Sequence, residues 1–323
     1  MLDVDRVLRQ ERLMRAMTGL TLPAFARLLV SFSMASEQAE QQDPTPRQRA
    51  RGGGRKPRLA GIDHQLFFVL FYFKCYPTFD LAGILFDLDR NQANRWLHRL
   101  QPLLEAALGK QLALPERKLT SVGQFVARFP DVKRVMIDGT ERPIQRPQDS
   151  ERQTETYSGK KRRNTRKHIA AVDEIKRVLV LSPAQDGRHH DKRLLDEAEI
   201  VGSIPTEIAI EVDLGFQGLQ KEYDNIQIGH KKPRGGSLTQ AQKDFNQALS
   251  RSRVVCENAF AGVKRYGAVS AVYRNRVTNF DDHLMLTATG LWNFYLMAAQ
   301  HRARGENPVH KRILFHNKSS VVR

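Results

Sequence analysis

The chain has 323 residues and a formal net charge of +17 at neutral pH, from 52 Lys and Arg residues against 35 Asp and Glu residues. This length allows one large domain and a smaller one, and the positive excess favours nucleic acid as a partner over an anionic membrane surface. No apolar run is long enough to span a bilayer and the first residues lack a signal-peptide core, so we expect a cytoplasmic protein rather than a membrane or secreted one.

The first 58 residues divide by composition into two parts. Residues 1–35 have helical periodicity, with Pro23 placed in the first turn of a second helix. Residues 36–58 are rich in Gln, Glu, Pro, Arg and Gly, which predicts a flexible linker with a basic end. That end can follow a phosphate backbone or enter a minor groove as an arm, or it can be a plain linker. The basic residues concerned are Arg51, Arg55, Lys56 and Arg58.

Residues 59–110 are predicted to form three helices, with a short turn at 87–89 before the third. One side of the third helix is apolar and includes Trp96, and the other side is rich in Arg and Asn, which can make bidentate contacts with base edges. This arrangement is typical of a helix-turn-helix domain, although a small helical bundle with a solvated face has the same pattern. In the first interpretation the DNA-binding residues are Arg90, Asn91, Asn94, Arg95 and His98.

Residues 130–300 have the pattern of an α/β domain. Two predicted strands end at Asp138 and Asp213, a strand pair turns at 173–174, and a shorter strand lies within 224–232. Helices are predicted between and after these strands. The order predicts a mixed five-stranded sheet with helices, as in the ribonuclease H-like fold, preceded by the all-α helix-turn-helix domain.

The longest predicted helix, residues 239–265, places Glu257 one turn after Arg253. Taken alone, these two residues are an ordinary i, i+4 surface pair, and an aspartate that closes a strand is often only a turn residue. Drawn together, however, Asp138, Asp213 and Glu257 would repel one another unless a cation lay between them, and hard oxygen ligands suit Mg²⁺ or Mn²⁺. We therefore predict a site for two such ions, which can promote in-line displacement at a phosphoryl group.

Between residues 151 and 168 the chain has seven basic residues and two acidic ones. A charge run is commonly just a solvated face, but beside Asp138 it favours a contact with the DNA backbone. The basic residues are Arg152, Lys160, Lys161, Arg162, Arg163, Arg166 and Lys167.

Other residues indicate structure rather than chemistry. Cys75 and Cys256 lie in apolar surroundings and outside any Cys/His cluster, so we expect two reduced, buried thiols and no zinc site. Trp292 is expected in the core rather than on a DNA base. Residues 301–323 are predicted to be a basic tail without regular structure.

Several separated motifs resemble those of the DDE transposases of bacterial insertion sequences, in the group related to the Harbinger elements. They occur in the family's order over nearly all of residues 1–300, helix-turn-helix included. The motifs are MIDGTERPIQRP, TYSGKKRRNTRKH, GRHHD, EVDLGFQG, the stretch from GHKKPRGG to GVKRY, and YRN.

The resemblance implies a ribonuclease H-like catalytic domain that cleaves and joins DNA strands with Mg²⁺, two ions per site. By position, Asp138, Asp213 and Glu257 are the catalytic and metal-binding residues. The resemblance also implies that Lys264 holds a terminal phosphate and that Arg253 orients Glu257 or binds DNA. Ser250 stands where relatives often have tyrosine. His190 and Asp191 are expected to hold the metal-binding residues in position without contacting the metal themselves.

The partners implied are double-stranded DNA, as terminal inverted repeats and as target, and further copies of the chain in a homodimer or larger complex at the bacterial nucleoid. Two alternatives remain: a structure-specific nuclease or resolvase of the ribonuclease H fold, and a domesticated DNA-binding regulator without catalysis. The presence of all three acidic residues counts against the regulator.

Overall fold

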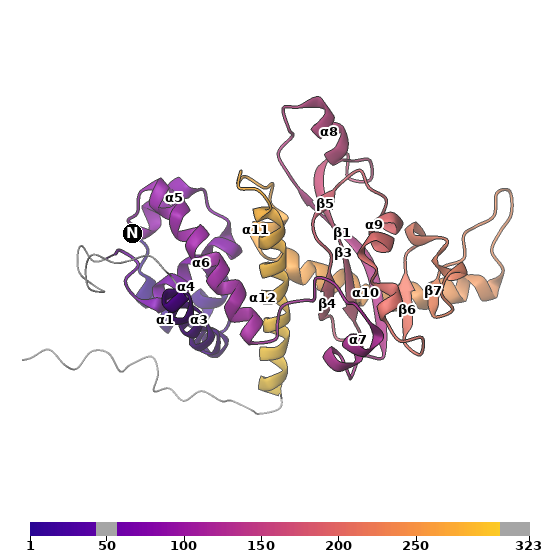
Figure 1. Ribbon diagram of the computed structural model, residues 1–323, viewed down its shortest axis with the longest axis horizontal. Coiled ribbons are helices and arrows are strands. Elements are labelled where there is room, and N and C mark those ends of the chain that lie inside the picture. The colour runs from indigo at the N-terminus through magenta and orange to yellow at the C-terminus, as the bar shows by residue number, and fades with distance from the viewer. Residues whose placement is uncertain (43–56, 304–323) are drawn as a thin grey trace, which may run out of the picture. The chain divides into compact units, whose positions relative to one another are not determined.

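The computed structural model describes residues 1–42 and 57–303, which form two compact units (Figure 1). The first unit contains residues 1–114, 266–268 and those from Asn293 on, and the second contains residues 115–265 and 269–292. Most of the predicted linker, including Arg51, Arg55 and Lys56, lies outside the described residues, as does the tail from residue 304 on.

The first unit is helical in all its described elements. Its helices are α1 (Val4–Arg9), α2 (Glu11–Thr18), α3 (Leu22–Gln42), α4 (Ile62–Cys75), α5 (Phe79–Phe86) and α6 (Arg90–Lys110). Pro23 lies in the first turn of α3, as predicted. The linker boundary at residue 36 is wrong, because α3 continues to Gln42. Ala35 is still buried there, and the Glu, Gln and Ala residues that follow are good helix formers.

The three helices predicted for the helix-turn-helix are α4, α5 and α6, with the turn where it was expected. Phe86 of α5 packs against three phenylalanines of α4, with ring centroids 4.9–6.0 Å apart. At Gly83 the chain approaches so closely that a Cβ would lie 2.5 Å from the Leu88 carbonyl oxygen, so this tight turn requires glycine. The N–H of Asp89 donates to the Gln92 side chain (3.2 Å), which caps α6.

The second unit is built on a mixed sheet with the path β4–β3–β1–β6–β7. Strand β3 is antiparallel to β1 and to β4, whereas β6 is parallel to β1 and β7 is parallel to β6. The strands are β1 (Arg134–Pro143), β3 (Arg163–Asp173), β4 (Val178–Leu181), β6 (Ala209–Val212) and β7 (Ile226–Ile228). Two short strands, β2 (Tyr157–Ser158) and β5 (Gln185–Asp186), pair with the first half of β3. The ribonuclease H-like fold class is thus confirmed.

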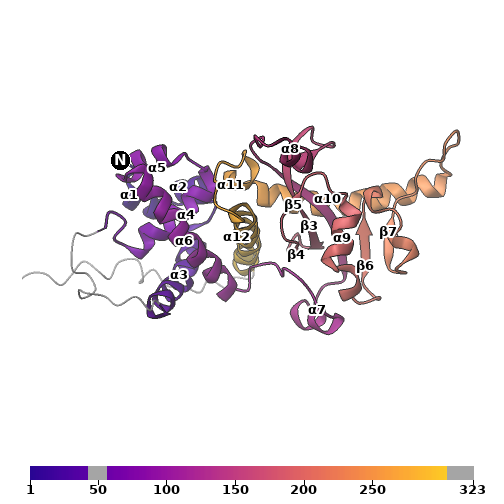
Figure 2. The same cartoon turned by 45° about the horizontal axis from the view of Figure 1, so that its top comes forward.

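Helix α10 (Gln240–Lys264) packs against β1, and α8 (Ser150–Thr156) and α9 (Asp191–Ala198) contact β3 (Figure 2). The other helices are α7 (Val122–Arg128), α11 (Gly267–Ser270) and α12 (Phe280–Ala303), the last two divided between the units. Trp292 is buried, as expected, and its Nε1 donates to the Lys176 carbonyl (2.9 Å). Cys256 is also buried, but Cys75 is exposed, contrary to expectation, because it is the last residue of α4 and lies beyond the buried run of that helix.

Candidate active site

Asp138 and Asp213 lie at neighbouring positions of the sheet. Strands β1 and β6 are parallel, and Ile137 is in register with Val212, so the residue that follows each of them is an aspartate. Each carboxylate accepts a hydrogen bond from the next backbone N–H: Asp138 from Gly139 (2.7 Å) and Asp213 from Leu214 (2.6 Å). Register and local hydrogen bonds therefore fix two carboxylates side by side. Only Asp213 lies at the end of a strand, directly after β6, since β1 continues past Asp138 to Pro143.

The Arg253 guanidinium lies between these two carboxylates. Its Nη2 is 3.3 Å from Asp138 Oδ2 and its Nη1 is 3.6 Å from Asp213 Oδ1. The Arg253 side chain is only 18% exposed, and that of Asp138 is 20% exposed, so solvent screens this contact weakly. The sequence pattern does not predict this contact, because it pairs Arg253 with Glu257 on the same helix.

The surroundings of Asp138 act on its pKa in opposite directions. Burial raises the pKa of Asp138, while the Arg253 charge and the Gly139 N–H lower it and the Asp213 charge raises it again, with a net upward shift. A half-buried carboxylate next to a second one favours any cation that can bind both. In this structure the cation is the guanidinium.

Glu257 lies apart from the aspartate pair, exposed on α10 one turn after Arg253. Its charge and that of Asp138 both raise the pKa of the Cys256 thiol, after the larger effect of burial. Glu257 on α10 and Asp138 on β1 therefore both lie within electrostatic reach of the Cys256 thiol. Within the described residues, no group of three His, Cys, Asp or Glu side chains is close enough to hold a metal ion.

Lys264, at the end of α10, connects this site to the basic run. Burial lowers its pKa, as do the charges of Lys161 and Arg163, while those of Glu141 and Asp138 raise it. The ammonium group thus lies within electrostatic reach of the first aspartate and of the basic residues between β2 and β3. Ser250 is exposed on the same helix.

Asp191 supports the strand that contains Asp138. Its carboxylate packs on Gly139, where a Cβ would meet Asp191 Oδ1 at 3.0 Å, and the same oxygen is 3.0 Å from Lys167 Nζ. Lys167 also donates to the His189 carbonyl (2.8 Å). Asp191 is not the N-cap of α9; His190 has that position and is exposed.

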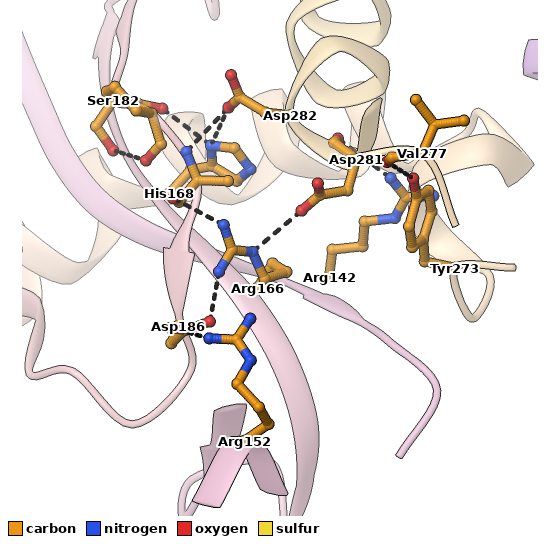
Figure 3. Close-up of polar contacts among 12 residues, drawn as sticks. Arg142, Arg152, Arg166, His168, Ser182, Asp186, Tyr273, Val277, Asp281 and Asp282 are labelled. Atoms are coloured by element: carbon orange, nitrogen blue, oxygen red, sulfur yellow. Dashed lines mark hydrogen bonds and ion pairs between the residues drawn. The ribbon is translucent and has the colours of Figure 1, made fainter. Parts of the chain in front are cut away.

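The basic run divides into exposed and buried members. Lys160, Lys161, Arg162 and Arg163 are exposed. Arg166 instead forms ion pairs with Asp186 and with Asp281 (3.1 Å) inside the unit, as Figure 3 shows. Lys167 is buried against Asp191. The interpretation of Arg166 and Lys167 as DNA contacts is therefore wrong, because sequence alone does not show which charges are neutralised by the fold.

The predicted DNA-contact residues of the helix-turn-helix all lie on α6, but they differ in exposure. Arg90, Asn91 and Arg95 are exposed, whereas Asn94 and His98 are half-buried. Near the start of α6 a cavity of ≈ 570 Å³ is lined by three arginines, two aspartates and one tryptophan, among other residues. Three of these side chains were not predicted to act together: Trp96, Arg99, whose guanidinium lies 5.4 Å from the Trp96 ring, and Arg58, paired with Asp87 at 2.9 Å.

No single helix within residues 1–42 and 57–303 is long and apolar enough to cross a membrane. Helices α2 and α3, which meet at 60°, pass that test only when they are taken together.

Comparison with known proteins gives three matches. Residues 137–293 match the family model described as DDE superfamily endonuclease, and residues 57–110 match the one described as helix-turn-helix of DDE superfamily endonuclease. The chain is 29% identical over 244 residues to a probable transposase for insertion sequence element IS702 from Microchaete diplosiphon, an alignment that covers 75% of this chain and 83% of that protein. No solved structure matches significantly.

Proposed function

This chain belongs to the DDE superfamily of endonucleases that have a helix-turn-helix, and on that premise we propose that it is the transposase of an insertion sequence. It cleaves DNA at the ends of the element and joins those ends to target DNA. The observation that best supports this activity is the pair of carboxylates on the neighbouring inner strands of the sheet, Asp138 on β1 and Asp213 directly after β6, which share one cation.

Membership of the family implies use of a divalent metal, and the donors fit one. Asp138 and Asp213 provide hard oxygen atoms in a place that already binds positive charge. We assign Asp138, Asp213 and Glu257 as the residues that hold Mg²⁺ or Mn²⁺, with two ions per site. Bound by these residues, the metal would supply activation of the attacking water or 3′-hydroxyl and stabilisation of the leaving oxygen.

The other residues of the site bind and position. Lys264 neutralises the phosphate next to the reacting one, because its ammonium group at the end of α10 lies within electrostatic reach of Asp138. Lys167 and Asp191 hold β1 in place beneath Asp138. The exposed basic residues between β2 and β3 follow the DNA backbone, and the exposed side of α6 reads the terminal repeats.

A structure-specific nuclease would share the fold and the carboxylates, and a regulator would share the helix-turn-helix. The similarity to an insertion-sequence transposase extends over both parts of the chain, which favours the transposase. Because transposition requires both element ends at once, we further propose that the active form contains at least two copies of the chain, which light scattering of the DNA complex would measure.

The test uses the purified full chain with Mg²⁺ and labelled DNA that ends in the inverted repeats flanking the gene. Strand cleavage at the repeat ends is expected from the natural protein. Asp138→Asn, Asp213→Asn and Glu257→Gln should each abolish cleavage and leave DNA binding largely intact, because each removes a metal ligand without removing positive charge.

Three results would contradict this proposal or its assignment of residues. Cleavage of branched DNA without regard to the repeats would indicate a resolvase. Cleavage retained in any of the three variants would show that its carboxylate is not a metal ligand. Binding of the repeats without cleavage by the natural protein would indicate a regulator.

A further inference from the structure

A cavity of ≈ 960 Å³ opens in the second unit beside α8 and the start of β3. Figures 1 and 2 both show α8 at the end of the sheet where β5 lies. The cavity has the size of a small-molecule site, and none of the residues that line it is acidic. Its wall combines arginines with an aromatic ring and aliphatic side chains. The residues that matter here are Arg162, Arg163, Arg188, Tyr157, Ile144 and Val272.

The arginines of this cavity are not neutralised by the fold. Arg162, Arg163 and Arg188 are exposed, and the described part of the chain provides no carboxylate within ion-pair distance of any of them. Arg166, three residues further along β3 than Arg163, is in contrast held by two aspartates. Unpaired guanidinium groups gathered in one cavity repel one another, so the cavity favours an anionic ligand, and guanidinium groups suit phosphate in particular.

The backbone at this site is also unusual. Arg162 has φ 51°, in the left-handed region that non-glycine residues rarely adopt. Such a conformation persists only where surrounding contacts maintain it, and it is common at binding sites. It places two successive arginines, Arg162 and Arg163, on the wall of one cavity.

A phosphate site alone would not need the apolar part of the wall. Tyr157 is 46% exposed and Val272 is 44% exposed, and Ile144 is half-buried beside them. An accessible aromatic ring among cations is the arrangement that binds a nucleobase by stacking while arginines bind its phosphates. The bases of an intact duplex are stacked inside the helix, so the ring can reach only a base that is unpaired.

The cavity lies within reach of the catalytic carboxylates. Strand β1 runs from Asp138 to Pro143, which lines the cavity, and five strand residues span about 17 Å. Arg163 also acts electrostatically on Lys264, which in turn senses Asp138. This distance corresponds to roughly five base steps, so a DNA strand cut at the aspartates can reach the cavity close to the cut.

We propose that this cavity binds one unpaired nucleotide of the DNA strand near the cut, with its base on Tyr157 and its phosphates on Arg162, Arg163 and Arg188. The proposal rests on the proposed function, because it takes its DNA strand from the strand cleaved at Asp138 and Asp213. It adds a ligand class that neither the motifs nor the family descriptions assign to these residues.

The experiment measures binding without divalent metal, so that no cleavage occurs. The probe is a short duplex of arbitrary sequence with one unpaired fluorescent adenine analogue, compared with the same duplex fully paired. Tyr157→Ala should weaken binding of the unpaired duplex by about tenfold and leave the paired duplex unchanged, because one stacked base is lost. Tyr157→Trp should retain the affinity and quench the analogue.

Matched variants distinguish a loss of binding in the cavity from a loss caused by removing any exposed tyrosine or any arginine. Tyr223→Ala removes another exposed tyrosine of this unit, and Arg193→Gln removes an arginine that is paired with Glu197 outside the cavity; neither should change the preference. Arg188→Gln should weaken the unpaired duplex more than the paired one. Thermal unfolding of each variant confirms that it is folded.

Three results would overturn the proposal: an equal loss for paired and unpaired DNA in Tyr157→Ala, no loss for either, or a free deoxynucleoside monophosphate that competes as well as the unpaired strand. Failure of the proposed function has a different readout. In that case the natural protein would not cleave the element ends with Mg²⁺, whatever its preference for an unpaired base.

Discussion

At Arg253 a protein side chain supplies the counter-charge for the two aspartates that we propose as catalytic. Its guanidinium contacts Asp138 and Asp213, the carboxylates that we assign to the metal. The side-chain cation and a divalent ion therefore compete for the same oxygen atoms. Metal binding requires that Arg253 leave at least one of these contacts, which makes it a residue that stabilises the metal-free protein.

Arg253→Gln should accordingly have two opposite effects. Without divalent metal, the free energy of unfolding should fall by about 1–3 kcal/mol, because two neighbouring carboxylates lose their counter-charge. The affinity for Mn²⁺ should rise, because the competing cation is gone. Urea unfolding in chelator and calorimetric titration with Mn²⁺ measure the two quantities.

Arg251→Gln on the same helix is the control. Arg251 is exposed, and its substitution removes the same charge from α10. If both variants lose equal stability and bind Mn²⁺ equally, the bridge between the aspartates has no energetic role.

His168 is a second residue whose environment sets a measurable property. It is fully buried, its Nδ1 lies 2.9 Å from the Ser182 carbonyl oxygen, and Asp282 is 3.7 Å away (Figure 3). The pKa of His168 is lowered to about 4, and burial is the largest cause. The Arg117 charge acts in the same direction, while the Ser182 contact and the charges of Asp281 and Asp282 oppose the shift. The imidazole is therefore neutral at pH 7.

Because the folded pKa of His168 is below the ordinary value of 6.5, only the unfolded chain takes up a proton between about pH 6.5 and 4. The contribution of His168 to stability is thus present above pH 6.5 and is lost as the pH falls, by at most about 3 kcal/mol. In His168→Gln the acid-induced decline should be shallower than in the natural protein. Urea unfolding across this pH range measures both curves.

His168→Gln must be compared with the natural protein, because other titrating groups change the stability in the opposite direction as the pH falls. Burial raises the pKa of Asp138 and of Asp173, so these carboxyls take up protons in the folded state first and favour it as the pH falls. Parallel curves for the variant and the natural protein would mean that His168 does not titrate in this range.

At the scale of elements, helix α10 shows how a packed interface depends on one small residue. Gly262 lies under the Trp292 ring, and a Cβ added there would meet ring atoms at 2.5 Å. Alanine is the better helix former by about 1 kcal/mol, but overpacking against a fixed indole costs about 1–3 kcal/mol. Gly262→Ala should therefore lower the thermal midpoint.

Gly123→Ala in α7 is the matched control. A Cβ at Gly123 would meet nothing closer than the Ser121 hydroxyl at 3.8 Å, so the helix propensity of alanine should act unopposed. Calorimetry should show a lower midpoint for Gly262→Ala and no loss for Gly123→Ala. A loss of stability in both would point to the helices themselves rather than to the tryptophan.

Local signals predict some elements well and others poorly. Helix α10 runs from Gln240 to Lys264, close to the predicted 239–265, because Thr239 and Gln242 form a capping box. Strand β1 was predicted only to Asp138, but it continues to Pro143 because β3 pairs with it along that length. The Arg253 bridge depends on the register of β1 with β6 and on where α10 packs, which no local pattern contains.

At the scale of the whole molecule, the net charge of +17 overstates the charge available to DNA. Several arginines of the second unit, such as Arg117, Arg166 and Arg177, are held by aspartates of the same unit. The sequence identifies nucleic acid as the partner from the total charge, but only the fold separates structural cations from those that face DNA.

Two exposed basic residues of different units should therefore contribute to DNA binding in different ways. Arg95 lies on α6, where we propose that base edges are read, and Lys161 lies between β2 and β3, where we propose backbone contacts. Arg95→Ala should reduce the discrimination between the terminal repeat and an unrelated duplex by about 1–3 kcal/mol. Lys161→Ala should weaken both duplexes alike and reduce the slope of log affinity against log salt by about 0.9, since one phosphate contact is lost.

Fluorescence anisotropy across a salt series measures both the discrimination and the salt slope. Arg193→Ala, which removes an ion-paired arginine, is the control and should change neither. If Arg95→Ala and Lys161→Ala had the same effect on both duplexes, the helix-turn-helix would be one more backbone-binding surface, and the element ends would have to be recognised elsewhere.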